Sequence, residues 1–152
     1  MFLAYAANKN FKLYQMDVKS EFLNGELEEE VYIEQLEGFP LTIEKDMVCK
    51  LKKALYGLKQ AYRIWYARLD KHLAKLGFAK GTADSNLYLK EIKYGLLIII
   101  VFVDDIIFGG DDEASNKFSE DMKNEFEMSM IGEMKLFLGL QKIGRASCRE
   151  RV

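Results

Sequence analysis

Residues 96–110 read LLIIIVFVDDIIFGG, in which two apolar runs flank a pair of adjacent carboxylates, Asp104 and Asp105. The first run is too short to span a membrane, which takes about 20 apolar residues. Short apolar runs of this kind are typical of buried strands, and two of them around a two-residue polar tip predict a β-hairpin. One interpretation of the two aspartates is that they only form the turn, because aspartate is common in turns. Paired carboxylates at the rim of a buried sheet are also the oxygen ligands that divalent cations require, so this tip is a candidate metal site.

A third carboxylate ends a second predicted strand. Residues 11–18 read FKLYQMDV, in which Gln15 and Asp17 share one face of an imperfect period-two pattern. Carboxylates on three strand ends of one sheet can hold two divalent ions, which clamp the attacking and leaving oxygens of a phosphoryl transfer. Asp17, Asp104 and Asp105 are therefore the candidate ligands of two Mg²⁺ ions, with Mn²⁺ as an alternative metal.

Four motifs in series resemble those of copia-type retrotransposon reverse transcriptases. Residues 17–25 (DVKSEFLNG) resemble the first catalytic motif, and residues 51–61 (LKKALYGLKQA) resemble the motif that handles nucleotide and template. Residues 102–105 (FVDD) resemble the metal-binding hairpin, and residues 137–141 (FLGLQ) the segment near the primer terminus. The order of the four motifs along the chain is that of the family.

This resemblance implies a fold, an activity and partners. The fold would be α+β, a polymerase palm-like domain with a mainly antiparallel sheet and packed helices, built like a split βαβ unit and incomplete. The activity would be RNA-directed DNA synthesis by two-metal nucleotidyl transfer, inside the cell in a cytoplasmic particle or the nucleus. The partners would be an RNA or DNA template-primer and deoxynucleoside triphosphates in the full-length protein, with no membrane.

The resemblance also assigns roles to individual residues. Asp17, Asp104 and Asp105 would hold the metals as the catalytic residues. Phe22 would crowd a ribose 2′-hydroxyl, while Tyr56 and Gly57 would line the incoming nucleotide. The residues that would contact nucleic acid are Lys59, Arg63, Phe137, Leu138 and Gly139.

The sequence departs from the family pattern at three positions. Family members usually carry a small residue where Glu21 stands, and proline where Leu36 and Tyr62 stand. A carboxylate at Glu21 is expected to face a triphosphate of the same sign. Two other interpretations therefore stay open: a decayed element remnant without activity, or a palm fold reused as an interaction module.

The last ten residues, 143–152, are those that one frame of a widely used sequencing adapter encodes. A natural basic tail is the alternative. We expect residues 1–142 to be a partial reverse transcriptase domain and 143–152 to be non-native read-through. The fingers, thumb and ribonuclease H regions are expected to be missing, so the isolated fragment is expected to be inactive.

Composition and charge fit one globular domain. The 152 residues are 49% hydrophobic, and 22 basic side chains oppose 24 acidic ones, for a net charge of −2. Basic residues concentrate in residues 50–80, where nine Lys or Arg stand against Asp70 alone, as expected of a segment that meets phosphates. The single histidine, His72, excludes a His-rich metal site. Of the two cysteines, Cys148 lies in the suspect tail, so one thiol remains and a disulfide framework is excluded.

Hydrophobic periodicity and turn residues predict the elements. Helices are expected at 1–8, at about 58–76 with Gly77 as its end, and over a segment that begins at an Asp111 or Asp112 cap and reaches Phe126. Strands are expected at 11–18, 31–34, about 47–51, 86–90, the two hairpin runs, and about 135–140.

Overall fold

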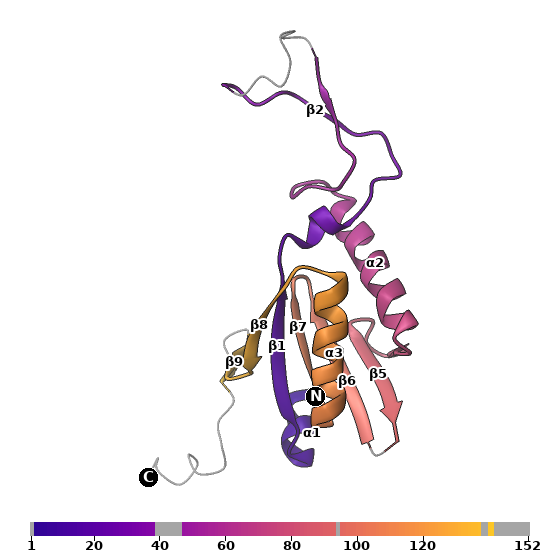
Figure 1. The fold of residues 1–152 in the computed structure, drawn as a ribbon, viewed down its shortest axis with the longest axis vertical. Coiled ribbons are helices and arrows are strands. Elements are labelled where there is room, and N and C mark those ends of the chain that lie inside the picture. The colour runs from indigo at the N-terminus through magenta and orange to yellow at the C-terminus, as the bar shows by residue number, and fades with distance from the viewer. Residues whose placement is uncertain (1, 39–46, 94, 138–139, 142–152) are drawn as a thin grey trace. The chain divides into compact units, whose positions relative to one another are not determined.

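The structure is a computed structural model that describes residues 2–38, 47–93, 95–137 and 140–141. The chain divides into two compact units (Figure 1). The first unit consists of Met1–Lys19 and Gly77–Val152, and the second of Ser20–Leu76. In sequence, the second unit is therefore an insertion within the first.

A six-stranded antiparallel sheet is the main part of the first unit (Figure 1). The hairpin predicted from residues 96–110 lies at its centre, and the strand that carries Asp17 pairs with the second arm of that hairpin. In spatial order the strands are β4 (Ala79–Lys80), β5 (Leu87–Ile92), β6 (Gly95–Phe102), β7 (Asp105–Gly110), β1 (Lys12–Val18) and β8 (Met128–Glu133).

Helix α3 (Asp112–Glu125) packs on one face of this sheet. Its Phe118 ring meets Phe108 of β7 edge-on, with ring centroids 4.9 Å apart. Of the two candidate caps, Asp111 and Asp112, it is Asp111 that caps the helix, by accepting a hydrogen bond from the backbone N–H of Ala114 at 3.0 Å. We call this side of the sheet the α3 face.

Within the first unit, helix α1 and a row of polar residues occupy the opposite side of the sheet. Helix α1 (Phe2–Lys9) packs Ala6 against Leu13 and Ile107, which lie toward the end of β1 and β7 away from the hairpin tip. Strand alternation places Gln15, Asp17 and Asp105 on this same side, nearer the tip. We call it the acidic face.

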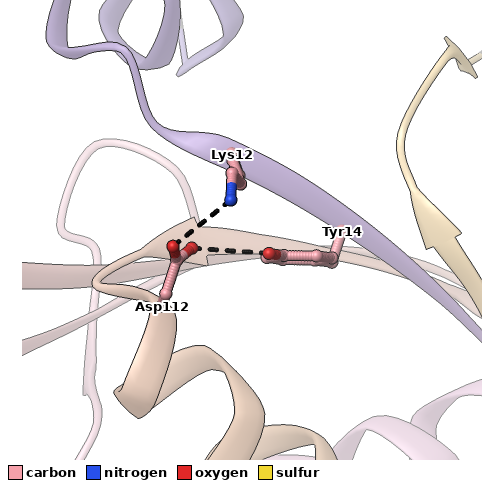
Figure 2. Close-up of polar contacts among 3 residues, drawn as sticks. All are labelled: Lys12, Tyr14 and Asp112. Carbon is pink, nitrogen blue, oxygen red and sulfur yellow. Dashed lines mark hydrogen bonds and ion pairs between the residues drawn. The ribbon is translucent and has the colours of Figure 1, made fainter.

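Three side chains connect β1 to the start of α3 (Figure 2). The Lys12 ammonium and the Tyr14 hydroxyl each donate to the Asp112 carboxylate, over 3.4 Å in both cases. Figure 2 shows both donors converging on that one carboxylate. Aspartate in the first turn of a helix also interacts favourably with the helix dipole.

The second unit contains the 3₁₀ helix η1 (Glu21–Asn24), the short pair β2 (Tyr32–Ile33) and β3 (Cys49–Lys50), and helix α2 (Ala61–Lys75). Helix α2 buries Ala61, Trp65, Leu69 and Leu73, which recur every four residues along one stripe. None of the described helices is long and apolar enough to cross a membrane.

Helix η1 and the glycine that follows it pack closely against α2. The Arg68 guanidinium donates to the backbone carbonyl of Asn24. At Gly25, which follows η1, an added Cβ would lie 2.4 Å from the Ile64 side chain, so glycine permits the close approach.

The structure confirms the predicted α+β class, the mainly antiparallel sheet and most of the predicted elements. Helix α2 begins at Ala61, three residues later than predicted, because two turns occupy residues 56–60. The strand predicted over about 135–140 is replaced by two short strands, β9 (Leu136–Phe137) and β10 (Leu140–Gln141), which pair with each other. The sequence does not predict strands β4 and β8.

Candidate active site

Asp17 and Asp105 lie directly opposite each other on the acidic face, because Asp17 of β1 and Asp105 of β7 are register partners. Opposite residues of an antiparallel pair have Cβ atoms about 4.5–5.5 Å apart and point to the same side of the sheet. Both residues are partly buried. The row continues to Phe102 of β6 on one side and to Ser129 of β8 on the other.

Gln15 lies two residues before Asp17 on the same face, as the alternation predicts. Its side-chain amide donates to Oδ1 of Asp105 at 2.9 Å. The hydrogen bond fixes the orientation of one carboxylate and brings a polar donor beside two like charges. Sequence reasoning places Gln15 on this face without giving it a role; the period-two spacing from Asp17 is the signal.

Asp104 occupies the two-residue turn between β6 and β7. Its backbone carbonyl accepts a hydrogen bond from the Val18 N–H at 3.0 Å, which ties the hairpin tip to the end of β1. The preceding residue, Val103, has φ of 53°. A β-branched residue in this region is strained, and such strain is common next to functional sites.

The described residues contain no group of three or more His, Cys, Asp or Glu side chains arranged to hold a metal ion. Of the three predicted ligands, the structure therefore brings Asp17 and Asp105 together as neighbours. Asp104 stands at the adjacent turn, connected through the backbone. The donor chemistry of the pair, two carboxylates side by side, suits a hard divalent cation.

In the second unit, Phe22 and Tyr56 form an aromatic pair. Their ring centroids are 4.7 Å apart and their planes are inclined by 71°, an edge-to-face arrangement. The Tyr56 hydroxyl donates to Oε2 of Glu21 at 2.6 Å. Glu21 is only 2% exposed, so its carboxylate is directed to Tyr56 inside the fold, which differs from the expectation that it faces a triphosphate.

A turn over residues 55–58 presents Tyr56. The Leu58 N–H donates to the Leu55 carbonyl at 3.3 Å, and Gly57 has φ of +91°. A positive φ at the third residue of a turn requires glycine or asparagine. An added Cβ at Gly57 would meet nothing within 4 Å, so glycine is needed here for its backbone conformation.

The basic residues assigned to nucleic acid differ in their surroundings. Lys59, in the turn before α2, and Arg63, in its first turn, are both exposed. Arg68, one of the nine basic residues of the 50–80 segment, instead donates to the Asn24 carbonyl and so stabilises the fold. Of the predicted primer-end residues, Phe137 belongs to β9, and Leu138 and Gly139 lie outside the described residues.

Comparison with protein families gives a match over residues 1–150 to the family described as reverse transcriptase (RNA-dependent DNA polymerase). The chain belongs to this reverse transcriptase family. The expectation of reverse transcriptase family membership that its four motifs carry is confirmed.

Curated relatives of this chain include Pol polyproteins of plant transposons. It is 37% identical over 150 residues to the retrovirus-related Pol polyprotein from transposon TNT 1-94 of Nicotiana tabacum, covering 97% of the chain and 11% of the relative. It is 35% and 36% identical to those from transposons RE2 and RE1 of Arabidopsis thaliana, covering 91% of the chain and 10% of each. The chain thus spans about a tenth of the length of these relatives, and no solved structure matches it.

Proposed function

We propose that this reverse transcriptase chain carries part of a nucleotidyl-transfer centre, and that its six-stranded sheet is the palm of a polymerase. The observation that carries the proposal is the pairing of Asp17 with Asp105 on the acidic face, beside the hairpin tip. Two carboxylates held side by side by strand register need no rearrangement to share a cation. The proposed substrates are deoxynucleoside triphosphates and an RNA or DNA template-primer.

Asp17 and Asp105 would hold divalent metal, and Asp104 would add a ligand from the adjacent turn. When bound, a pair of Mg²⁺ ions supplies activation of a primer hydroxyl and neutralisation of the departing pyrophosphate. The protein contributes rigidity to this site. Register fixes Asp17 against Asp105, the Gln15 amide orients Asp105, and the hydrogen bond from Val18 holds the backbone of Asp104.

In the second unit, Phe22 would exclude the ribose 2′-hydroxyl, and Tyr56 would contact the incoming nucleotide. The edge-to-face contact between the two rings supports a shared role. Lys59 and Arg63 would contact template-primer phosphates, which is consistent with the exposure of both side chains. Residues 143–152 are proposed to be non-native; they lie outside the described residues.

Manganese binding by the 152-residue chain tests the metal site without requiring catalysis. Free Mn²⁺ is measured by electron paramagnetic resonance during a titration. Because each ligand contributes charge to the site, Asp17→Asn and Asp105→Asn are each expected to weaken Mn²⁺ binding by about tenfold or more. Asp104→Asn is expected to weaken it as well.

Asp121→Asn, which removes a carboxylate of α3, is the matched control and is expected to bind Mn²⁺ as the unsubstituted chain does. Equal Mn²⁺ affinity for Asp17→Asn, Asp105→Asn and the control would contradict the proposed site. Melting temperatures of all variants show whether each one is folded.

A further inference from the structure

Glu21 is an unusual residue because its carboxylate is buried. It is 2% exposed and is the one charged side chain among the buried residues that the structure describes. Glutamate is almost never fully buried unless it is paired, since a carboxylate removed from water without a hydrogen-bond donor is costly. The fold therefore has to supply a donor to this position.

That donor is the Tyr56 hydroxyl, 2.6 Å from Oε2 of Glu21. The two residues are 35 positions apart in sequence, so the contact exists only in the folded unit. This distance falls in the range of charge-assisted O–H···O⁻ bonds, which are shorter and stronger than neutral ones. Tyr56 itself is 61% exposed, so packing alone does not hold its ring.

Orientation of the Tyr56 ring matters because its neighbour is Phe22. The rings meet edge-to-face with centroids 4.7 Å apart. Glu21 and Phe22 are consecutive residues of η1, and Tyr56 stands on the turn that Gly57 makes. Tyr56 therefore contacts two neighbouring residues of η1: its hydroxyl donates to Glu21, and its ring packs against Phe22.

We propose that Glu21 is a positioning residue for sugar selection: it holds Tyr56 against Phe22 and so tightens discrimination against ribonucleotides. The inference rests on the proposed function, in which Phe22 is the steric gate. It assigns a task to the carboxylate that departs from the family pattern. Glu21 acts through Tyr56 and does not itself contact the nucleotide.

The first arm of the test measures the contact in the 152-residue chain. A 3-fluorotyrosine placed at position 56 reports the ring environment by ¹⁹F NMR. Glu21→Leu, which cannot accept a hydrogen bond, is expected to shift and narrow this signal as the ring gains freedom. Glu21→Gln keeps an acceptor oxygen and is expected to retain the original signal. Glu28→Leu, at an exposed glutamate of the same unit, is the control.

The second arm measures sugar selection by isothermal titration calorimetry of the unlabelled 152-residue chain with dUTP and with UTP, which differ only in the 2′-hydroxyl, in the presence of Mn²⁺. The unsubstituted chain is expected to favour dUTP. Removing a hydrogen bond to a charged group weakens the positioning of Tyr56, so Glu21→Leu is expected to lower the ratio of the two affinities by about tenfold. Glu21→Gln is expected to keep the dUTP to UTP affinity ratio of the unsubstituted chain. Tyr56→Phe is expected to lower this ratio as Glu21→Leu does.

The Phe22→Ala variant distinguishes the proposed gate role of Phe22 from the proposed positioning role of Glu21. If Phe22→Ala lowers the ratio of dUTP to UTP affinity while Glu21→Leu leaves it unchanged, the positioning role of Glu21 is wrong and the gate role of Phe22 is supported. If Phe22→Ala leaves the ratio unchanged, the proposed gate is wrong. Binding of neither nucleotide by the unsubstituted chain would overturn the proposed nucleotide site, and an unchanged ¹⁹F signal in Glu21→Leu would overturn the Glu21–Tyr56 contact. Melting temperatures identify any variant that is unfolded.

Discussion

Gln15 is a neutral residue that stabilises the carboxylate pair of Asp17 and Asp105. Strand register places two carboxylates opposite each other on one face, and like charges directly opposite are destabilising. The Gln15 amide offsets part of this repulsion by donating to Asp105 at 2.9 Å. In the proposed metal site this hydrogen bond would orient the Asp105 carboxylate toward a cation. If the site binds metal as proposed, Gln15 contributes to metal binding by orienting a ligand, without binding the metal itself.

Gln15→Met is therefore expected to lower Mn²⁺ affinity by about tenfold, the effect typical of removing a hydrogen bond that orients a metal ligand. Methionine has a similar length but cannot donate. Isothermal titration calorimetry on the 152-residue chain measures the change. Gln60→Met is the control, because the Gln60 amide donates to Glu29 in the second unit. Equal affinities for the two variants would show that Asp105 needs no such support.

At the residue scale, the sequence predicts contacts within regular strands and fails elsewhere. Alternation in residues 11–18 and the hairpin pattern suffice to bring Asp17 and Asp105 to one edge of a sheet. The environment of Glu21 could not be predicted, because its burial depends on a 3₁₀ helix and on a tyrosine 35 residues later. The neighbouring turn at Gly57 was predictable, since glycine marks positive φ.

The link between β1 and α3 illustrates how elements are connected. Burial raises the pKa of the Tyr14 hydroxyl above its ordinary value of 10.0, and the Asp112 charge raises it further. The charge of Asp112 and its hydrogen bond likewise raise the pKa of Lys12 above 10.5. Both shifts mean that the folded state holds these protons more tightly than the unfolded chain does.

Stability should consequently fall at alkaline pH. A raised pKa in the folded state stabilises it fully below the ordinary pKa, and this contribution disappears as pH rises through the folded pKa. We expect the free energy of unfolding to decrease above about pH 10, measured by urea unfolding at pH 8, 10 and 11. Tyr14→Phe is expected to make this decrease smaller, whereas Tyr5→Phe, at an exposed residue, leaves it unchanged. If the free energy of unfolding of the two variants depends on pH in the same way, the Tyr14 hydroxyl is not a source of the alkaline loss of stability.

Helices and strands can be predicted from the sequence where their hydrophobic patterns extend over many residues. The apolar stripe of α2 and the Asp111 cap of α3 indicate those two helices, and the apolar runs indicate β6 and β7. Strand β8 escapes prediction because residues 128–133 read MSMIGE, with exposed apolar residues and a glycine that break the alternation. It forms because β1 offers an unpaired edge, which is a tertiary effect outside any local window.

For the whole molecule, charge distribution matters more than net charge. The net charge is −2, yet the 50–80 segment holds nine basic residues and one acid. Nucleic-acid binding by this chain should therefore be local to that segment and sensitive to salt. Arg68 is an exception within the segment, since its guanidinium is bound to the Asn24 carbonyl.

Binding of an RNA–DNA duplex, followed by fluorescence anisotropy over a salt series, tests this view. Each phosphate that a cation no longer neutralises reduces the slope of log K against log salt by about 0.9, so Lys59→Gln combined with Arg63→Gln should reduce it by about 2. Lys117→Gln with Lys123→Gln, two exposed lysines of α3, is the charge-matched control. Equal slopes for the two double variants would show that the phosphates bind elsewhere on the chain.

The division into two units is not predicted by the sequence. Composition changes little at residues 20 and 76, and no linker rich in glycine or proline marks either junction. The boundaries are set by which strands pair: β1 joins β7 and β8 across the whole insertion. Such pairings between distant segments leave no local signal in a single sequence.

Strand β1 lies between β7 and β8, and Gln15 reaches Asp105 across 90 residues of chain. A ribosome adding about 5–20 residues per second needs roughly 5–20 s to make that intervening chain. Throughout this interval the nascent β1 has neither of its neighbours, and a strand with unpaired edges is a template for pairing with other chains. Translation speed and chaperone access should therefore decide how much of this protein reaches its native state.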